Sequence, residues 1–274
     1  MQEYADGVML EKASEKGDRN APFLLAGIYV RNIKDYDKAL YWYKTCYNRG
    51  NKDCALGAGM VYSDCLGDYK NGKIWYKEAY QMGSAEGAYG LAGIIADIDK
   101  DYPKAIEWYE KAYKMDDIEA AYALGLLYHQ TLKDYPKAIE WYQIAHNKKH
   151  TEAANALGLL YKQVLQDYPK AIEWYTIAYK MGDINAPNNL GLLYKDVLKD
   201  YPKAIEWFQK SYDKNKNHYG SLYWIAVIHR DGLGIKKDLT KARLLFQEIA
   251  NNGVGEAKKL SKQALLALDS AKSQ

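Results

Sequence analysis

The chain has little of what marks several large classes of protein. Its 274 residues include only three cysteines, Cys46, Cys54 and Cys65, and none of them forms a Cys-x-x-Cys pair. Three irregularly spaced cysteines are too few for a disulfide framework, so we expect a reducing compartment. Proline is scarce too, at six residues, and a chain that is 48% hydrophobic has little room for a disordered tail.

An excess of one charge and long apolar runs are also missing. The 38 basic and 35 acidic residues leave a formal net charge of +3, which is too weak to steer the protein onto nucleic acid or an anionic membrane. No stretch approaches the roughly 18 apolar residues of a membrane span, and the first residues lack the pattern of a signal peptide. We expect a cytoplasmic protein, or a periplasmic or secreted one if the given chain has lost a signal peptide.

One repeated phrase organises the sequence. It reads Asp-Tyr-Pro-Lys-Ala-Ile-Glu-Trp-Tyr from Asp101 and returns almost unchanged from Asp134, Asp167 and Asp200, at a constant step of 33 residues. Two further steps back along the chain reach two more aspartates, each followed by tyrosine. A fixed period of this size is typical of solenoids, in which stacked helical hairpins share one core. The sequence therefore predicts an all-α solenoid of stacked antiparallel helix pairs.

Each repeat is expected to contain a first helix, called A, and a second helix, called B. The A helices are predicted at about 20–30, 53–62, 86–95, 119–128, 152–161 and 185–194. Their middles carry a column of small residues, Ala26, Gly59, Ala92, Gly125, Gly158 and Gly191. Glycine inside a helix costs about 1 kcal/mol relative to alanine. We therefore interpret this column as the place where a neighbouring helix crosses too closely for a side chain.

The B helices carry the repeated phrase. Asp101 and its equivalents are predicted to be N-caps, because their carboxylates can accept a hydrogen bond from an otherwise unpaired amide. Six of the seven tryptophans form one column at the 33-residue step, Trp42, Trp75, Trp108, Trp141, Trp174 and Trp207. Such a column could be a ligand-stacking platform, but at helical spacing beside an alanine column we interpret it as core.

The ends of the chain depart from the repeat. Residues 1–18 are predicted to form an N-terminal capping helix, 19–253 a single solenoid of about seven helix pairs, and 254–274 a C-terminal capping helix that runs from about Gly255 to Lys272. Capping elements are expected because a solenoid must close its exposed ends.

A run near the C-terminus identifies a family. It is His229-Arg-Asp-Gly-Leu-Gly-Ile-Lys-Lys-Asp-Leu-Thr-Lys-Ala242. With the phrases Ala-x-x-x-Leu-Gly-x-x-Tyr and Lys-Ala-x-x-Trp-Tyr-x-x-Ala of the other copies, it resembles the Sel-one-like repeat family, relatives of the tetratricopeptide repeat. Most copies here lack the Gly-x-Gly loop of that family, so their A-to-B connections should be tighter.

The resemblance implies a right-handed superhelix whose A helices line a concave groove and whose B helices form the convex back. Family members are typically adaptors in protein-complex assembly, degradation and signalling, and in bacteria include host-interaction proteins and partners that neutralise secreted toxins. A secreted branch pins each repeat with a disulfide, and this chain is expected to lack the paired cysteines.

We therefore expect a protein-interaction scaffold or adaptor that is monomeric and not an enzyme, with a protein or peptide as its partner and neither nucleic acid nor membrane. A bacterial immunity or regulatory protein that neutralises an effector toxin is the alternative, followed by a small-ligand-binding or hydrolytic solenoid.

No sequence pattern predicts a catalytic, cofactor-binding or metal site. A Gly-rich phosphate loop, Gly-x-Ser-x-Gly and His-Glu-x-x-His are absent. On a helix, His146 and His150 would place two imidazoles on one face, as metal ligands require. No carboxylate or thiol stands at a defined spacing from them, so we interpret them as part of an exposed turn.

Candidate partner-binding residues are the variable positions that flank the A-helix core stripe. They are Phe23, Leu56, Tyr89, Tyr122, Asn155, Asn188 and Tyr223 before the stripe, and His129, Lys162, Lys195 and Arg230 after it. The groove is predicted to be apolar and aromatic in its first half, then amide-rich and basic, which suits an extended peptide or helix with an apolar and an acidic segment. Drift among duplicated copies would give the same variation, and both interpretations stay open.

Overall fold

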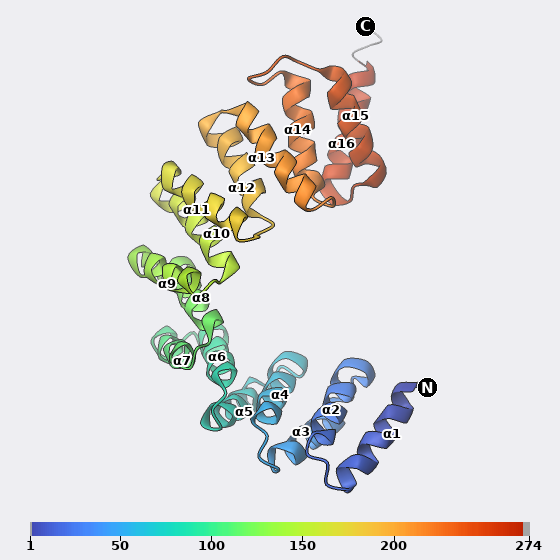
Figure 1. The fold of residues 1–274 in the computed structure, drawn as a ribbon, viewed down its shortest axis with the longest axis vertical. Helices are drawn as coiled ribbons and strands as arrows, with labels where there is room; N and C mark the ends of the chain where they lie inside the picture. The colour runs from blue at the N-terminus through green and yellow to red at the C-terminus, as the bar shows by residue number, and fades with distance from the viewer. Residues whose placement is uncertain (1, 271–274) are drawn as a thin grey trace. The chain divides into compact units, whose positions relative to one another are not determined.

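The computed structural model describes residues 2–270, with side chains from residue 7 onward. Within these residues all regular structure is helical, comprising sixteen α-helices and six π-helical segments. Successive helices pack as antiparallel pairs, so the predicted all-α arrangement is confirmed (Figure 1). The chain divides into two compact units, Met1–Lys133 and Asp134–Gln274, and each is described by itself. In the described part of the chain, no helix is both long and apolar enough to span a bilayer.

The first unit contains an N-terminal helix followed by A and B helices in alternation. Its elements are α1 (Gln2–Glu15), α2 (Ala21–Ile28), η1 (Tyr29–Ile33), α3 (Tyr36–Tyr47), α4 (Lys52–Met60), η2 (Val61–Cys65), α5 (Tyr69–Gln81), α6 (Ala85–Ile94), η3 (Ile95–Asp99), α7 (Tyr102–Lys114), α8 (Ile118–Leu126) and η4 (Leu127–Leu132). The η segments are π-helical turns that extend the A helices α2, α4, α6 and α8. Periodicity did not predict these turns.

The second unit continues the alternation and ends with a solitary helix. Its elements are α9 (Tyr135–Asn147), α10 (Thr151–Leu160), η5 (Tyr161–Leu165), α11 (Tyr168–Lys180), α12 (Ala186–Leu193), η6 (Tyr194–Leu198), α13 (Tyr201–Lys214), α14 (Tyr219–Asp231), α15 (Leu239–Asn252) and α16 (Gly255–Ser270). The predicted end of the last helix, Lys272, lies outside the described residues. The boundaries proposed above for one solenoid between two caps stay a prediction.

Aspartate caps begin the B helices, as predicted. The capping residues are Asp35, Asp68, Asp101, Asp134, Asp167, Asp200 and Asp238, and each accepts a hydrogen bond from the amide three residues later at 2.8 to 3.3 Å. In five copies a single left-handed residue, such as Lys100 (φ 57°), separates the π-helical turn from the cap, and after η2 Leu66 and Gly67 do so. The Gly-x-Gly copy instead needs the loop from Gly232 to Lys237. The tighter connections predicted for the other copies are confirmed.

The small-residue column faces an aromatic ring of the neighbouring B helix. A methyl group added at Gly158 would lie 2.5 Å from the ring of Tyr175, and one at Gly191 would lie 2.5 Å from the ring of Phe208. Both rings are fully buried. The close approach was predicted correctly, and the group that makes it is a side-chain ring.

The tryptophans contribute less to the core than predicted. Trp174 and Trp207 are half-buried, whereas the residue after each, Tyr175 or Phe208, is 0% exposed. Trp207 meets the ring of Tyr179 edge-on, with centroids 5.4 Å apart. The tryptophan therefore links successive B helices along their outer side, because the following residue points more directly at the A helix.

Two of the cysteines form a disulfide, which corrects the expectation that this chain lacks paired cysteines. Cys46 near the end of α3 and Cys54 in α4 are joined, with Cα atoms 5.9 Å apart, and both are fully buried. Cys65 is free and exposed. The short turn between α3 and α4 brings the pair together, which spacing along the sequence did not show. Disulfides are typical of oxidising compartments, so the bond removes the support for a reducing one, and the location stays a prediction.

Candidate functional site

A cavity of about 710 Å³ opens on the A helices of the first unit. Leu56 and Met60 of α4, Tyr89 and Ile94 of α6 and Ile98 of η3 supply its apolar lining. Met60 is 49% exposed and Ile98 is 46% exposed, so a partner can reach both. Large apolar side chains that remain accessible in a concave site are typical of binding surfaces.

Three carboxylates line the same cavity. They belong to Asp64, Glu86 and Asp97, and all three residues are exposed. The Ser63 hydroxyl donates to Asp64 Oδ1 at 2.5 Å, and the Ser84 hydroxyl donates to Glu86 Oε2 at 2.9 Å. Hydrogen bonds from its own backbone amide and from Ser84 hold the pKa of Glu86 below its usual range. Glu86 is therefore negatively charged at neutral pH.

A second cavity of about 410 Å³ shares Glu86 and Tyr89 with the first. It adds the carboxylates of Asp116, Asp117 and Glu119. Burial, followed by the charges of Glu119, Asp117 and Asp97, raises the pKa of the Tyr89 hydroxyl. The ring of Tyr89 therefore lies between two cavities in a negative environment.

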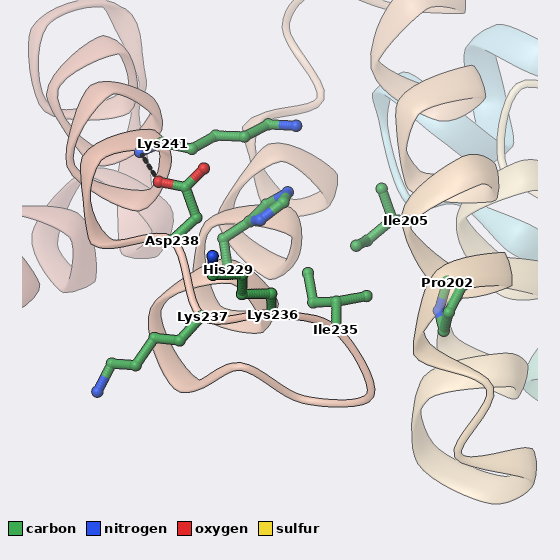
Figure 2. A pocket seen from close by; sticks show the side chains of 8 residues that line it. All are labelled: Pro202, Ile205, His229, Ile235, Lys236, Lys237, Asp238 and Lys241. Carbon is green, nitrogen blue, oxygen red and sulfur yellow. Dashed lines mark hydrogen bonds between the residues drawn. The ribbon is translucent and has the colours of Figure 1, made fainter.

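The second unit has a cavity of about 590 Å³ beside the Gly-x-Gly loop. Figure 2 shows the His229 ring and the Lys241 side chain on one side, facing Ile205 and Ile235, while Lys237 extends away. Burial, reinforced by Lys241, lowers the pKa of His229, so this imidazole is neutral at pH 7. Neither of its ring nitrogens has a hydrogen-bond partner in the structure.

The predicted residues of the first unit differ in their surroundings. Leu56 and Tyr89 line the cavity on the A helices. Phe23 is 37% exposed and meets a buried tyrosine ring edge-on. Tyr122 lies half-buried on α8, and His129 is buried at 9% exposure rather than facing outward. Leu56 and Tyr89 are thus the two predicted residues that the structure brings together at a cavity in this unit.

The predicted amide positions of the second unit bond to neighbouring A helices. Asn189 Nδ2 donates to Asn155 Oδ1 at 2.9 Å, and the Ser221 hydroxyl donates to Asn188 Oδ1 at 3.1 Å. Tyr223 packs between aromatic rings of α14 and α15. The two asparagines link consecutive repeats, whereas Tyr223 packs within the last repeat, and the sequence pattern revealed neither structural role.

The predicted basic positions are partly engaged within the protein. Lys195 Nζ lies 2.5 Å from Asp196 Oδ1 and 3.5 Å from the centre of a tryptophan ring of α14. The guanidinium of Arg230 donates twice to Asp231, at 2.7 and 2.8 Å. Lys162 lies half-buried on η5. Their roles in partner binding stay predictions.

Sequence reasoning missed the carboxylates of the first unit. Asp64 and Asp97 stand one 33-residue step apart. Their column is the one directly after the column that contains His129, Lys162 and Lys195. Glu86 belongs to another repeat column, which continues with Glu119 and Glu152. Comparing these columns would have shown that the apolar half of the groove is also acidic.

His146 and His150 do not share a helical face, contrary to the premise of a metal pair. Helix α9 ends at Asn147, and His146 meets the ring of Trp174 edge-on at 5.2 Å. His150 precedes α10 and is buried at 7% exposure, so the prediction of an exposed turn is wrong for it. Among the described residues, no three His, Cys, Asp or Glu side chains gather as a metal site would require.

Comparison with known proteins identifies the repeats. A family model described as Sel1 repeat matches residues 23–51, 52–84, 85–117, 118–150, 151–183, 188–216 and 220–254. The chain belongs to the Sel1 repeat family. These seven Sel1 repeats account for most of the sequence, and the prediction of the family is confirmed. No curated protein matches the chain.

Solved structures share the fold of these Sel1 repeats. A Sel1 repeat protein from Oxalobacter formigenes is 21% identical, with a TM-score of 0.66 over 94% of this chain and 80% of that one. A protective antigen of uropathogenic Escherichia coli with an SLR fold is 23% identical, with a TM-score of 0.63 over 94% of this chain, and the match spans 60% of that protein. Yeast Tom70 is 15% identical, with a TM-score of 0.61 over 97% of this chain and 58% of that one.

Proposed function

We propose that this Sel1 repeat protein is a non-catalytic scaffold that binds a partner protein or peptide through the A-helix side of its repeats. The main support is the cavity on α4 and α6, where Met60 and Ile98 remain exposed next to Tyr89. Aromatic and large apolar groups of this kind provide most of the binding energy in protein interfaces. Neutralisation of a toxin is one form of this function and depends on the identity of the partner.

The cavity beside His229 does not support a second, catalytic function. Asp238 could orient an imidazole, but its Oδ1 accepts the backbone amide of Lys241 at 2.8 Å and caps α15. A general base needs a partner that orients it, and His229 has no hydrogen-bond partner. The carboxylate beside this cavity, that of Asp238, therefore serves to start helix α15 and does not orient the His229 imidazole.

Selection of peptide ligands on the full chain tests the proposal. Peptides from a random display library are selected on the intact protein and then measured against Tyr89→Ala and Lys162→Glu, which alter the A-helix side of each unit. Tyr41→Ala is the matched control, because this tyrosine is 62% exposed on the B helix α3. All variants are first checked for equal helicity by circular dichroism.

We expect the selected peptides to bind at least roughly tenfold more weakly to one of the A-side variants and equally well to Tyr41→Ala. A selection that yields no ligand, or ligands that only Tyr41→Ala weakens, would contradict the proposed function. Light scattering of the same samples tests the prediction that the protein is a monomer.

A further inference from the structure

We propose that the partner of the first unit is a cationic peptide segment, with lysine or arginine next to large apolar side chains, seated in the two cavities on either side of Tyr89. This inference rests on the proposed function and specifies the chemistry of the partner. The two cavities, of about 710 and 410 Å³, are called the Tyr89 site below.

The apolar part of the Tyr89 site explains why a peptide with large apolar side chains fits. Leu56, Met60, Ile94 and Ile98 form a continuous lining with the Tyr89 ring, drawn from two consecutive A helices and the π-helical turn η3. Cavities of several hundred cubic ångströms accommodate drug-sized groups, which corresponds to a few side chains. Covering Met60 and Ile98, each nearly half exposed, removes apolar surface from water.

The charge of the Tyr89 site decides which peptide fits. Its lining contains six carboxylates, those of Asp64, Glu86, Asp97, Asp116, Asp117 and Glu119. Among the described residues that line the two cavities there is no lysine, arginine or histidine. The nearby charge of Lys52 helps to lower the pKa of Glu86, but the Lys52 ammonium donates its hydrogen bond to the Gly83 carbonyl at 3.2 Å. An acidic partner would be repelled here, whereas a basic one gains attraction and a faster association.

The charge of the whole first unit points the same way. Residues 1–133 contain 20 acidic and 17 basic residues, whereas residues 134–274 contain 15 acidic and 21 basic residues. The first unit is therefore negative, although the net charge of the whole chain is slightly positive. The net charge of this unit is only −3 (17 − 20), so the attraction for a cationic segment comes mainly from the carboxylates that line the Tyr89 site.

Lysine and arginine suit a site in which carboxylates surround an apolar lining. Their side chains bury an aliphatic stem on apolar surface while the charged end remains at the rim. In the Tyr89 site the stem can lie over Met60 or Ile98 while the charge meets Asp64 or Asp97. A small polyamine would gain only the charge contribution, and a metal ion would find no cluster of ligands among the described residues.

Fluorescence anisotropy with synthetic peptides tests the inference. The probe is a short labelled peptide of leucines and lysines. One comparison peptide has glutamate in place of every lysine, and another has serine in place of every leucine. The full chain is compared with Asp64→Asn, Asp97→Asn and Met60→Ser. The control is Asp37→Asn, which makes the same change at an exposed position of the B helix α3 in the same unit. These four positions are solvent-exposed in the wild-type chain, and equal thermal unfolding confirms that each variant folds.

We expect the leucine–lysine peptide to bind and the other two to bind at least roughly tenfold more weakly. Each Asp→Asn change in the site should weaken binding about two- to fivefold, as expected for exposed ion pairs, and Asp37→Asn should leave it unchanged. Met60→Ser should weaken it roughly five- to tenfold. Raising the salt concentration to about 0.5 M should reduce the effect of the aspartate changes, because salt screens exposed charges.

Three outcomes would overturn the inference. The glutamate peptide binding equally well would refute the charge argument, and spermidine displacing the peptide at equal concentration would refute the apolar one. Equal binding to all variants would place the peptide outside the Tyr89 site. In each case the display selection decides separately whether the A-helix side binds any partner, so the proposed scaffold function stands or fails on its own result.

Discussion

The Tyr175 hydroxyl of α11 is buried without a hydrogen-bond partner, so removing it should stabilise the protein. The side chain is 0% exposed, and burial raises the pKa of the hydroxyl well above its usual value. Phe208 occupies the equivalent position of the next repeat, is also 0% exposed and has no hydroxyl. Tyr175→Phe therefore keeps the ring that packs against the A helix and deletes only the unpaired group.

The expected gain follows from the cost of an unpaired polar group. Leaving a buried hydroxyl without a partner costs about 1 to 3 kcal/mol, and part of this is offset by lost contacts of the oxygen atom. We expect Tyr175→Phe to raise the free energy of unfolding by about 1 kcal/mol, or the unfolding temperature by about 2 to 4 °C. Tyr76→Phe should have the opposite effect, because the Tyr76 hydroxyl shares a 3.1 Å hydrogen bond with Ser63 Oγ.

Urea unfolding followed by far-UV circular dichroism measures both changes. The reverse substitution, Phe208→Tyr, is the third member of the series and should destabilise the protein, because it buries a new hydroxyl at a fully enclosed position. The reasoning would be refuted if Tyr175→Phe lowered the urea midpoint. Equal shifts for Tyr175→Phe and Tyr76→Phe would also refute it, because the two hydroxyls differ in having a partner.

The remaining predictions concern a glycine, the disulfide and a histidine. Gly158→Ala should lower the free energy of unfolding by about 1 to 3 kcal/mol, since its methyl would lie 2.5 Å from the Tyr175 ring, while Gly220→Ala, which meets open space, should raise it by up to about 1 kcal/mol in urea unfolding. Cys46→Ala should remove about 2 to 3 kcal/mol of disulfide stabilisation, and the unfolding of this variant should no longer respond to a reducing agent. Burial lowers the pKa of His229 in the folded state, so the unfolded chain binds this proton more tightly and stability falls as the pH drops below about 6.5; His229→Tyr should reduce that fall between about pH 7.5 and 5.5.

The helix pairs and their caps could be predicted because each rests on local chemistry repeated in every copy. An aspartate before Tyr-Pro-Lys is a complete start signal, since the carboxylate accepts an amide and proline needs no partner in the first turn. Asp101 and Asp167 meet that expectation, with cap distances of 3.3 and 3.2 Å. Agreement among copies made the prediction strong.

The π-helical turns and the disulfide could not be predicted from local chemistry. The π-helical turns begin where the A helices were predicted to end and continue into the predicted connections, and in four of the six a left-handed lysine such as Lys100 follows the turn. Lysine has no intrinsic preference for that conformation, so the pattern contains no sign of it. Cys46 and Cys54 pair because α3 and α4 meet at a short turn, which is a three-dimensional property.

The candidate site was predicted in part, because a repeat column shows that a position varies and not what it faces. Leu56 and Tyr89, which were predicted to bind a partner, line a cavity, and their role in binding stays a prediction. Asn155 and Asn188 belong to the same column, yet they bond to the adjacent A helix and thereby join consecutive repeats. One column can therefore change from binding surface to structural link along a single chain.

The acidic columns show how repetition can leave room for specificity. Packing constrains the glycine, alanine and aromatic positions. An atom added there would collide with a buried ring, and an atom removed would leave a void in the core. The column of Asp64 and Asp97 is exposed, and it continues with glutamine at positions 130 and 163. Changing such a residue alters the charge of a cavity without disturbing the core, since exposed substitutions change stability little. The partner chemistry of each cavity can therefore vary independently of the fold that presents it.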